Sequence, residues 1–104
     1  MARYICKITD AEDNKVYYFE WSTVVNAPVT HGMSLEEFRQ YYEKEYGRSE
    51  MDGLERRLQR VEQNGISAIG EDLDELLARN HAGENGKKMS KKEILELIKQ
   101  PQED

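Results

Sequence analysis

The sequence predicts an α+β domain in which an N-terminal β-hairpin packs against three to four short α-helices. The first 25 residues contain two runs in which apolar and polar side chains alternate, and this period of two is typical of strands. Later residues instead repeat apolar positions three or four apart behind capping residues, as helices do. A chain of 104 residues supports one small core. We therefore expect a single domain, with a hairpin and connector in 1–33, a helical core in 34–80, and a loop, a basic helix and a frayed tail in 81–104.

The two predicted strands cover residues 2–9 and 16–25, and the polar segment 10–15 between them favours a turn. A third short strand through Val29 is an alternative that the connector leaves open. An isolated hairpin is marginal in water, so the helices must cover its aromatic face, and we expect Trp21 to be buried there. That face of the second strand holds Tyr17, Phe19, Trp21 and Thr23, while Tyr18, Glu20 and Ser22 lie opposite, off the predicted core.

Two helices are expected in the middle of the chain. Ser34 and Glu37 have the spacing of a capping box, and Gly47 suits the end of the helix that follows. A second helix, over residues 50–63, is predicted to start near Ser49, with Asp52 completing a similar capping pattern.

A third helix is predicted over about residues 71–80. The apolar residues that follow its period begin before this range, with two isoleucines. Gly70 interrupts this series and weakens the pattern. The residues that fit one helical face are Ile66, Ile69, Leu73, Leu76 and Leu77.

The last predicted helix begins with a capping box of Ser90 and Glu93 and ends before Pro101. Residues 84–99 sum to +2 on a chain that is acidic overall, and a Gly/Asn loop precedes them. We therefore expect residues 87–99 to form a peripheral, partly detachable helix that serves a partner more than the core. Packing of its apolar face on its own domain is the alternative.

Charge and cysteine content limit the function classes. The chain carries 15 basic and 21 acidic residues, a formal net charge of −6, which opposes non-specific binding to nucleic acid or anionic membranes. The single cysteine, Cys6, rules out an internal disulfide and a zinc site built from cysteines. No signal-peptide or membrane-span pattern is present, so we expect a soluble protein of the cytoplasm, or of the host cytoplasm if a phage encodes it.

The sequence holds no pattern that predicts catalysis. It contains no nucleophile elbow, no phosphate-cradling glycine loop and no pair of histidines at metal-binding spacing. We expect no enzyme activity, no catalytic residues, no cofactor and no metal.

The remaining candidates are surface residues, and they favour a protein–protein interaction module such as an adaptor, inhibitor or assembly factor. A homodimer is one form that this interaction could take. Tyr18 and Tyr41 lie off the predicted core faces, and tyrosine is common in binding hot spots. The alternative is a DNA-binding protein that uses the arginines of residues 50–63 and the lysines of residues 87–92. The basic candidates for partner binding are Arg56, Arg57, Arg60, Lys87, Lys88, Lys91 and Lys92. In size and charge, the chain resembles phage and prophage accessory proteins, which act by binding host or virion proteins.

Overall fold

The computed structural model describes residues 3–100, and the frayed tail expected at residues 101–104 lies outside them. Strands β1 (Arg3–Asp10), β2 (Lys15–Ser22) and β3 (Ala27–Pro28) form an antiparallel sheet in the order β1-β2-β3. Four α-helices follow: α1 (Leu35–Tyr46), α2 (Met51–Asn64), α3 (Leu73–Ala78) and α4 (Lys91–Lys99). Short 3₁₀ turns occupy Arg48–Glu50 and Glu84–Gly86. The predicted α+β class and the alternative third strand are confirmed, although β3 ends just before Val29.

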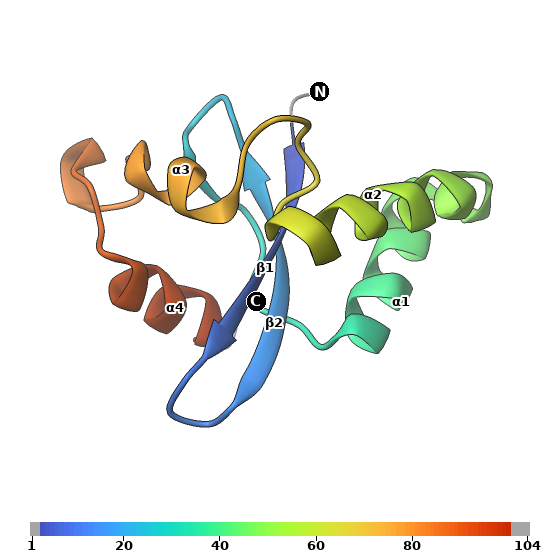
Figure 1. Cartoon of the computed structure of the whole chain (residues 1–104), viewed down its shortest axis with the longest axis horizontal. Helices are drawn as coiled ribbons and strands as arrows, with labels where there is room; N and C mark the ends of the chain where they lie inside the picture. The colour runs from blue at the N-terminus through green and yellow to red at the C-terminus, as the bar shows by residue number, and fades with distance from the viewer. Residues whose placement is uncertain (1–2, 101–104) are drawn as a thin grey trace.

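The sheet is covered on both faces. Figure 1 shows α1 and α2 on one side of the hairpin and α3 and α4 on the other. The α3/α4 face buries the apolar residues of alternating strand positions, including Cys6, Ile8, Phe19 and Trp21. As predicted, Trp21 is fully buried.

The second covered face corrects the sequence interpretation. Tyr18 and Glu20 were expected to point away from the core, yet Tyr18 is 5% exposed and Glu20 is 0% exposed. Tyr18 packs with Ile5, Phe38 and Leu54 under helices α1 and α2. The pattern misled because period-two alternation identifies the two faces of a strand but does not say whether the more polar face meets water.

Local capping explains where three of the helices begin. The predicted capping boxes of α1 and α4 are both formed, and a third one, made by Asp72 and Glu75, starts α3. The box expected at Ser49 and Asp52 is not formed. The reason is that Arg48–Glu50 already turn as a 3₁₀ helix that continues directly into α2, so the chain has no extended N-cap residue there.

Helix α4 belongs to the core of its own domain. Ile94 and Ile98 are 0% and 1% exposed, and they join the same apolar cluster as Trp21 and Phe19. The backbone O of Ile98 also accepts a hydrogen bond from Gly32 N–H at 2.6 Å. The apolar face of the helix therefore packs on its own domain, which is the alternative left open by the sequence, and a role of this helix in binding a partner stays a prediction.

No helix within residues 3–100 is long and apolar enough to cross a membrane.

Candidate functional site

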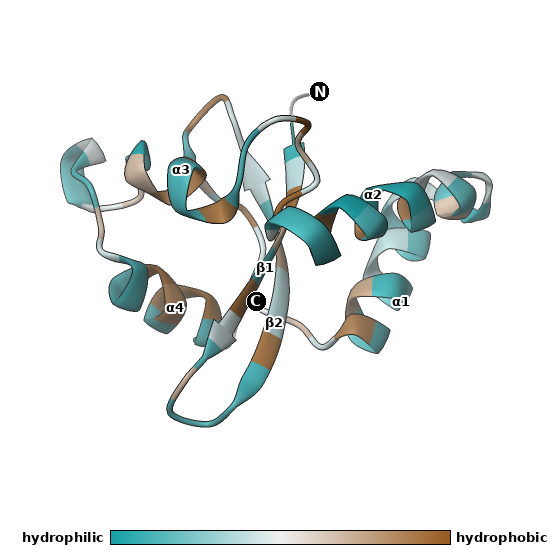
Figure 2. Ribbon diagram, in the orientation of Figure 1, coloured by the Kyte–Doolittle hydropathy of each residue, from teal (hydrophilic) through white to brown (hydrophobic). Residues whose placement is uncertain are grey.

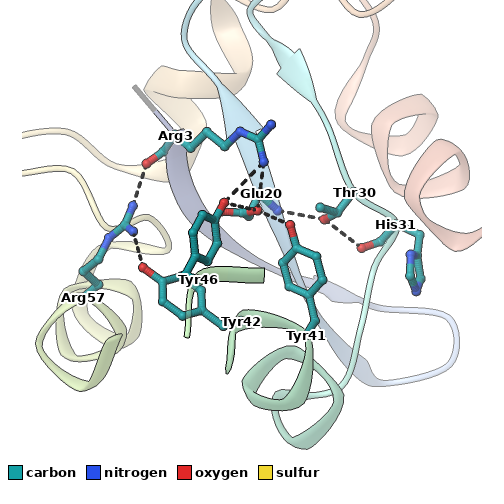
Figure 3. Close-up of polar contacts among 8 residues, drawn as sticks. All are labelled: Arg3, Glu20, Thr30, His31, Tyr41, Tyr42, Tyr46 and Arg57. Atoms are coloured by element: carbon teal, nitrogen blue, oxygen red, sulfur yellow. Dashed lines mark hydrogen bonds and ion pairs between the residues drawn. The ribbon is translucent and has the colours of Figure 1, made fainter. Parts of the chain in front are cut away.

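A buried carboxylate on β2 is the centre of the polar network in Figure 3. The side chain of Glu20 lies between the sheet and α1, where the rings of Tyr41 and Tyr46 point toward it. The Tyr46 hydroxyl lies 2.9 Å from Glu20 Oε2 and 3.0 Å from Oε1, and the Tyr41 hydroxyl donates to Oε1. Arg3 adds an ion pair at 3.3 Å. A buried charge is stable only when it is paired and hydrogen-bonded, and these three residues meet that need for Glu20.

The network keeps its tyrosines protonated. Burial, together with the hydrogen bond to Glu20, raises the pKa of Tyr41 well above its ordinary value, and the pKa of Tyr46 rises for the same reasons. A hydrogen bond with Tyr46 raises the pKa of Arg3. Tyr41, Tyr46 and Arg3 therefore keep their protons near neutral pH, and their contacts with Glu20 hold α1 on the sheet.

The two tyrosines proposed as partner contacts both have internal roles. The Tyr18 hydroxyl donates to Glu62 on α2 at 2.9 Å. Burial, followed by this hydrogen bond, raises the pKa of Tyr18 to about 12. Tyr18 is therefore closed off beneath the helices, which corrects its assignment to an open face. Tyr41 is half-buried, and its hydroxyl is directed at Glu20.

The arginines of α2 are also largely used inside the domain. Arg57 donates from one nitrogen to the Tyr42 hydroxyl at 2.9 Å and from the other to the backbone O of Arg3 at 2.6 Å (Figure 3). Arg60 Nε donates to the backbone O of Ser67 at 2.7 Å. Arg56 is exposed, and no carboxylate among residues 3–100 pairs with it.

The predicted basic lysines lie in another part of the molecule. They occupy the segment before α4 and its first turn, on the opposite side of the hairpin from α2 (Figure 1). Lys91 reaches Asp74 at 3.8 Å, a loose contact between exposed side chains. The structure therefore does not combine the arginines and lysines into one basic surface. The three other lysines, Lys87, Lys88 and Lys92, are exposed.

Two loops present aliphatic side chains to water. Between β2 and β3, Val24 and Val25 are 81% and 54% exposed, and between α2 and α3, Ile69 is 87% exposed. Figure 2 shows these apolar tips at the same end of the molecule. Ile69 fits the helical period seen in the sequence, but α3 begins at Leu73, within the predicted range of about 71–80, so Ile69 lies in the loop before it.

Hydrogen bonds hold both loops in place. The Ser22 hydroxyl accepts from the backbone N–H of Val24 at 3.2 Å, and the carbonyl of Asn26 accepts from His81 N–H at 2.8 Å. In the second loop, Ser67 N–H donates to Ile5 O at 2.9 Å and the Ser67 hydroxyl accepts from Ile5 N–H. The exposed aliphatic residues therefore sit between anchored loop ends. Asn26 and Gly70, both at positive φ, follow the tips directly and are the sequence signals for these turns.

Cys6 has no reactive character. It is fully buried in the α3/α4 face, and burial raises the pKa of its thiol far above the ordinary value. A cysteine reacts as its thiolate and only where a reagent can reach the sulfur. Burial denies Cys6 both conditions. Within residues 3–100, no group of three or more His, Cys, Asp or Glu side chains is placed to hold a metal ion.

Comparisons with known proteins bring no relative: the sequence matches no known family and no curated protein, and the fold matches no solved structure. The residues themselves are therefore the basis for a function.

Proposed function

We propose that this chain is a small acidic protein–protein interaction module and that the apolar loop tips of Val24, Val25 and Ile69 are its principal contact surface. The supporting observation is their exposure. Each is more than half exposed, whereas the other large apolar side chains on the surface of residues 3–100, such as Val16 and Leu97, are at most 39% exposed. Aliphatic groups held out in water by anchored loops lose little conformational freedom when a partner covers them, which favours binding.

The arrangement gives less support to DNA binding. Two of the three α2 arginines donate hydrogen bonds within the domain, and the lysines lie across the hairpin from them. A DNA-binding surface needs its cations on one face to neutralise neighbouring phosphates. The acidic balance of the chain opposes it further.

Comparative affinity capture tests this proposal. The double variant Val24→Ser with Ile69→Ser should lose a partner that the parent chain retains, because truncating hot-spot residues costs about 2 kcal/mol or more, roughly a thirtyfold loss of affinity. Leu97→Ser, which changes a less exposed aliphatic residue elsewhere, is the matched control and should retain the partner. If every captured protein binds the double variant as well as the parent, the loop tips are not the contact surface.

A further inference from the structure

The loop tips of Val24, Val25 and Ile69 belong to the two longest stretches of the chain that contain no Asp, Glu, Lys or Arg. These stretches are residues 21–35 and 63–70, in a sequence of which 35% is charged. Figure 1 shows the β2–β3 loop and the α2–α3 loop at the same end of the molecule. The exposed aliphatic residues therefore belong to segments that bring no charge of their own.

The charged residues closest in sequence to the loop tips already have partners within the domain. Glu20, just before the first stretch, is fully buried and forms an ion pair with Arg3 at 3.3 Å. Glu71, just after the second stretch, accepts from both terminal nitrogens of Arg79, one of them at 2.8 Å. Asp72 caps the N-terminus of α3. A partner that covers the tips therefore does not have to neutralise these carboxylates.

The rest of the surface is less suited to contact between two copies. The net charge of −6 lies outside the two uncharged stretches, so other approaches of one copy to another bring like charges together. A groove of about 450 Å³ lies beside Thr9, between the end of β1 and α4, and its walls carry three lysines and three carboxylates. Contact there would depend on ion pairs, which salt weakens. At the loop tips, two copies can instead meet through side chains that carry no charge.

We propose that the loop tips form the interface of a two-fold homodimer, in which they cover the loop tips of a second copy. This inference rests on the proposed function, because it names the partner of the same contact surface. A two-fold interface uses the same patch on both chains, so the patch must be complementary to itself. Aliphatic side chains without a free charge beside them meet this condition, since each copy removes the apolar surface of the other from water.

The small size of the patch sets the strength of this dimer. A stable interface buries about 800 Å² on each partner, which is more than three aliphatic side chains supply. The hydrogen bonds of Ser22 and Ser67 hold both loops in place, so little order has to be gained on association. We therefore expect a weak dimer, with a dissociation constant of about 0.1 mM.

Sedimentation equilibrium of the full chain at two salt concentrations tests the dimer. The mass of the parent protein should rise from 12.2 kDa toward twice that value as its concentration approaches about 1 mM. Raising the salt from about 0.05 M to about 0.5 M should strengthen the association, because salt screens the repulsion between two acidic chains and the aliphatic contact has no charge to screen. A dimer formed through the charged groove should weaken instead.

Charge substitutions locate the interface. Ile69→Glu should raise the dissociation constant at least about tenfold, because it places an unpaired charge in the contact. Val24→Glu, in the other loop, should do the same, and it keeps the test decisive if Ile69→Glu does not fold. Leu97→Glu adds the same charge outside both uncharged stretches and should change the constant by less than about threefold. Circular dichroism melts establish that each variant is folded.

A parent chain that stays monomeric at about 1 mM overturns the inference. A dimer that weakens with salt, or one that both loop-tip substitutions leave intact, also overturns it, because the interface then lies elsewhere. The proposed function is measured separately, by affinity capture. A different protein that the parent chain retains and the Val24→Ser, Ile69→Ser variant loses would keep the loop tips as a contact surface of a monomeric chain.

Discussion

The two faces of the hairpin are held to their helices by different physics. On the α3/α4 face, the strands contribute apolar side chains such as Phe19 and Trp21. On the α1/α2 face, the apolar contacts of Ile5 and Tyr18 are joined by a buried carboxylate, Glu20, which reaches across to two tyrosines of α1. Apolar burial supplies most of the free energy of folding but is not directional, whereas hydrogen bonds to a buried charge require a fixed geometry.

This difference suggests how the hairpin register is fixed. A slip of one residue would turn every β2 side chain to the opposite face. It would move Glu20 into the largely apolar α3/α4 cluster and leave the hydroxyls of Tyr41 and Tyr46 without their acceptor. The apolar face therefore favours collapse, and the polar face selects one register.

The largest expected effect comes from uncovering the apolar face. Truncation after Gly86 removes Ile94 and Ile98, and burying these two side chains contributes about 3–6 kcal/mol. A domain of this size has a total stability of about 5–15 kcal/mol, so we expect loss of the cooperative melt and of the near-UV signal of Trp21. Thermal melting followed by circular dichroism measures both. A truncated chain that melts cooperatively near the parent temperature would return α4 to the role of a detachable arm.

Two alanine substitutions at neighbouring positions of α4 test whether the buried side of this helix stabilises the fold more than its exposed side does. Ile98→Ala should cost about 2–5 kcal/mol because Ile98 is 1% exposed. Its neighbour Leu97 is 39% exposed, and Leu97→Ala should cost less than about 1 kcal/mol. Urea denaturation gives both values, and equal costs would mean that α4 does not pack as described.

A smaller effect is expected from the polar face. Glu20→Gln keeps the size of the side chain but removes the charge and one acceptor oxygen, so we expect a loss of about 1–3 kcal/mol. Glu62→Gln is the control, since Glu62 also accepts a tyrosine hydroxyl on this face but its side chain is 57% exposed. It should cost less than about 1 kcal/mol. Similar losses for the two variants, measured by urea denaturation, would contradict the assignment of Glu20 as the anchor of this face.

The sequence predicted more of the apolar face than of the polar one. Alternation around Trp21 and the capping boxes at Ser34 and Ser90 are local signals, so the aromatic face and two helix starts could be read directly. Burial of Glu20 depends on Tyr41 and Tyr46, which are more than 20 positions away, and no local pattern encodes that contact. A glutamate is almost never buried without such partners, so its outward placement was the reasonable prediction.

The candidate sites depend on tertiary contacts in the same way. The exposure of the loop tips was not predicted, because Val24 and Val25 continue a β-prone run and Ile69 fits the period of a helix. Only the early end of β2 at Ser22 and the late start of α3 leave these residues in loops. The groove beside Thr9 could not be predicted at all, since it requires α4 to pack against the end of β1.

The smallest expected effect concerns acid stability, where α4 meets the sheet through an ion pair as well as apolar contacts. The hydrogen bond from Lys99, followed by that from Glu12 N–H, holds the pKa of Asp10 below its ordinary value. A carboxyl group whose folded pKa is depressed stabilises the fold above its unfolded pKa of about 4, and this contribution is lost as the pH falls through the folded value. Asp10→Asn should therefore lower the melting temperature at pH 7 and make it fall less between pH 7 and about pH 2 than in the parent chain. Glu36→Gln, which changes an exposed carboxylate with no partner among the described residues, should leave the parent slope unchanged. If Asp10→Asn reproduces the full acid dependence of the parent, the ion pair contributes nothing to holding α4, and apolar contacts alone account for its position on the sheet.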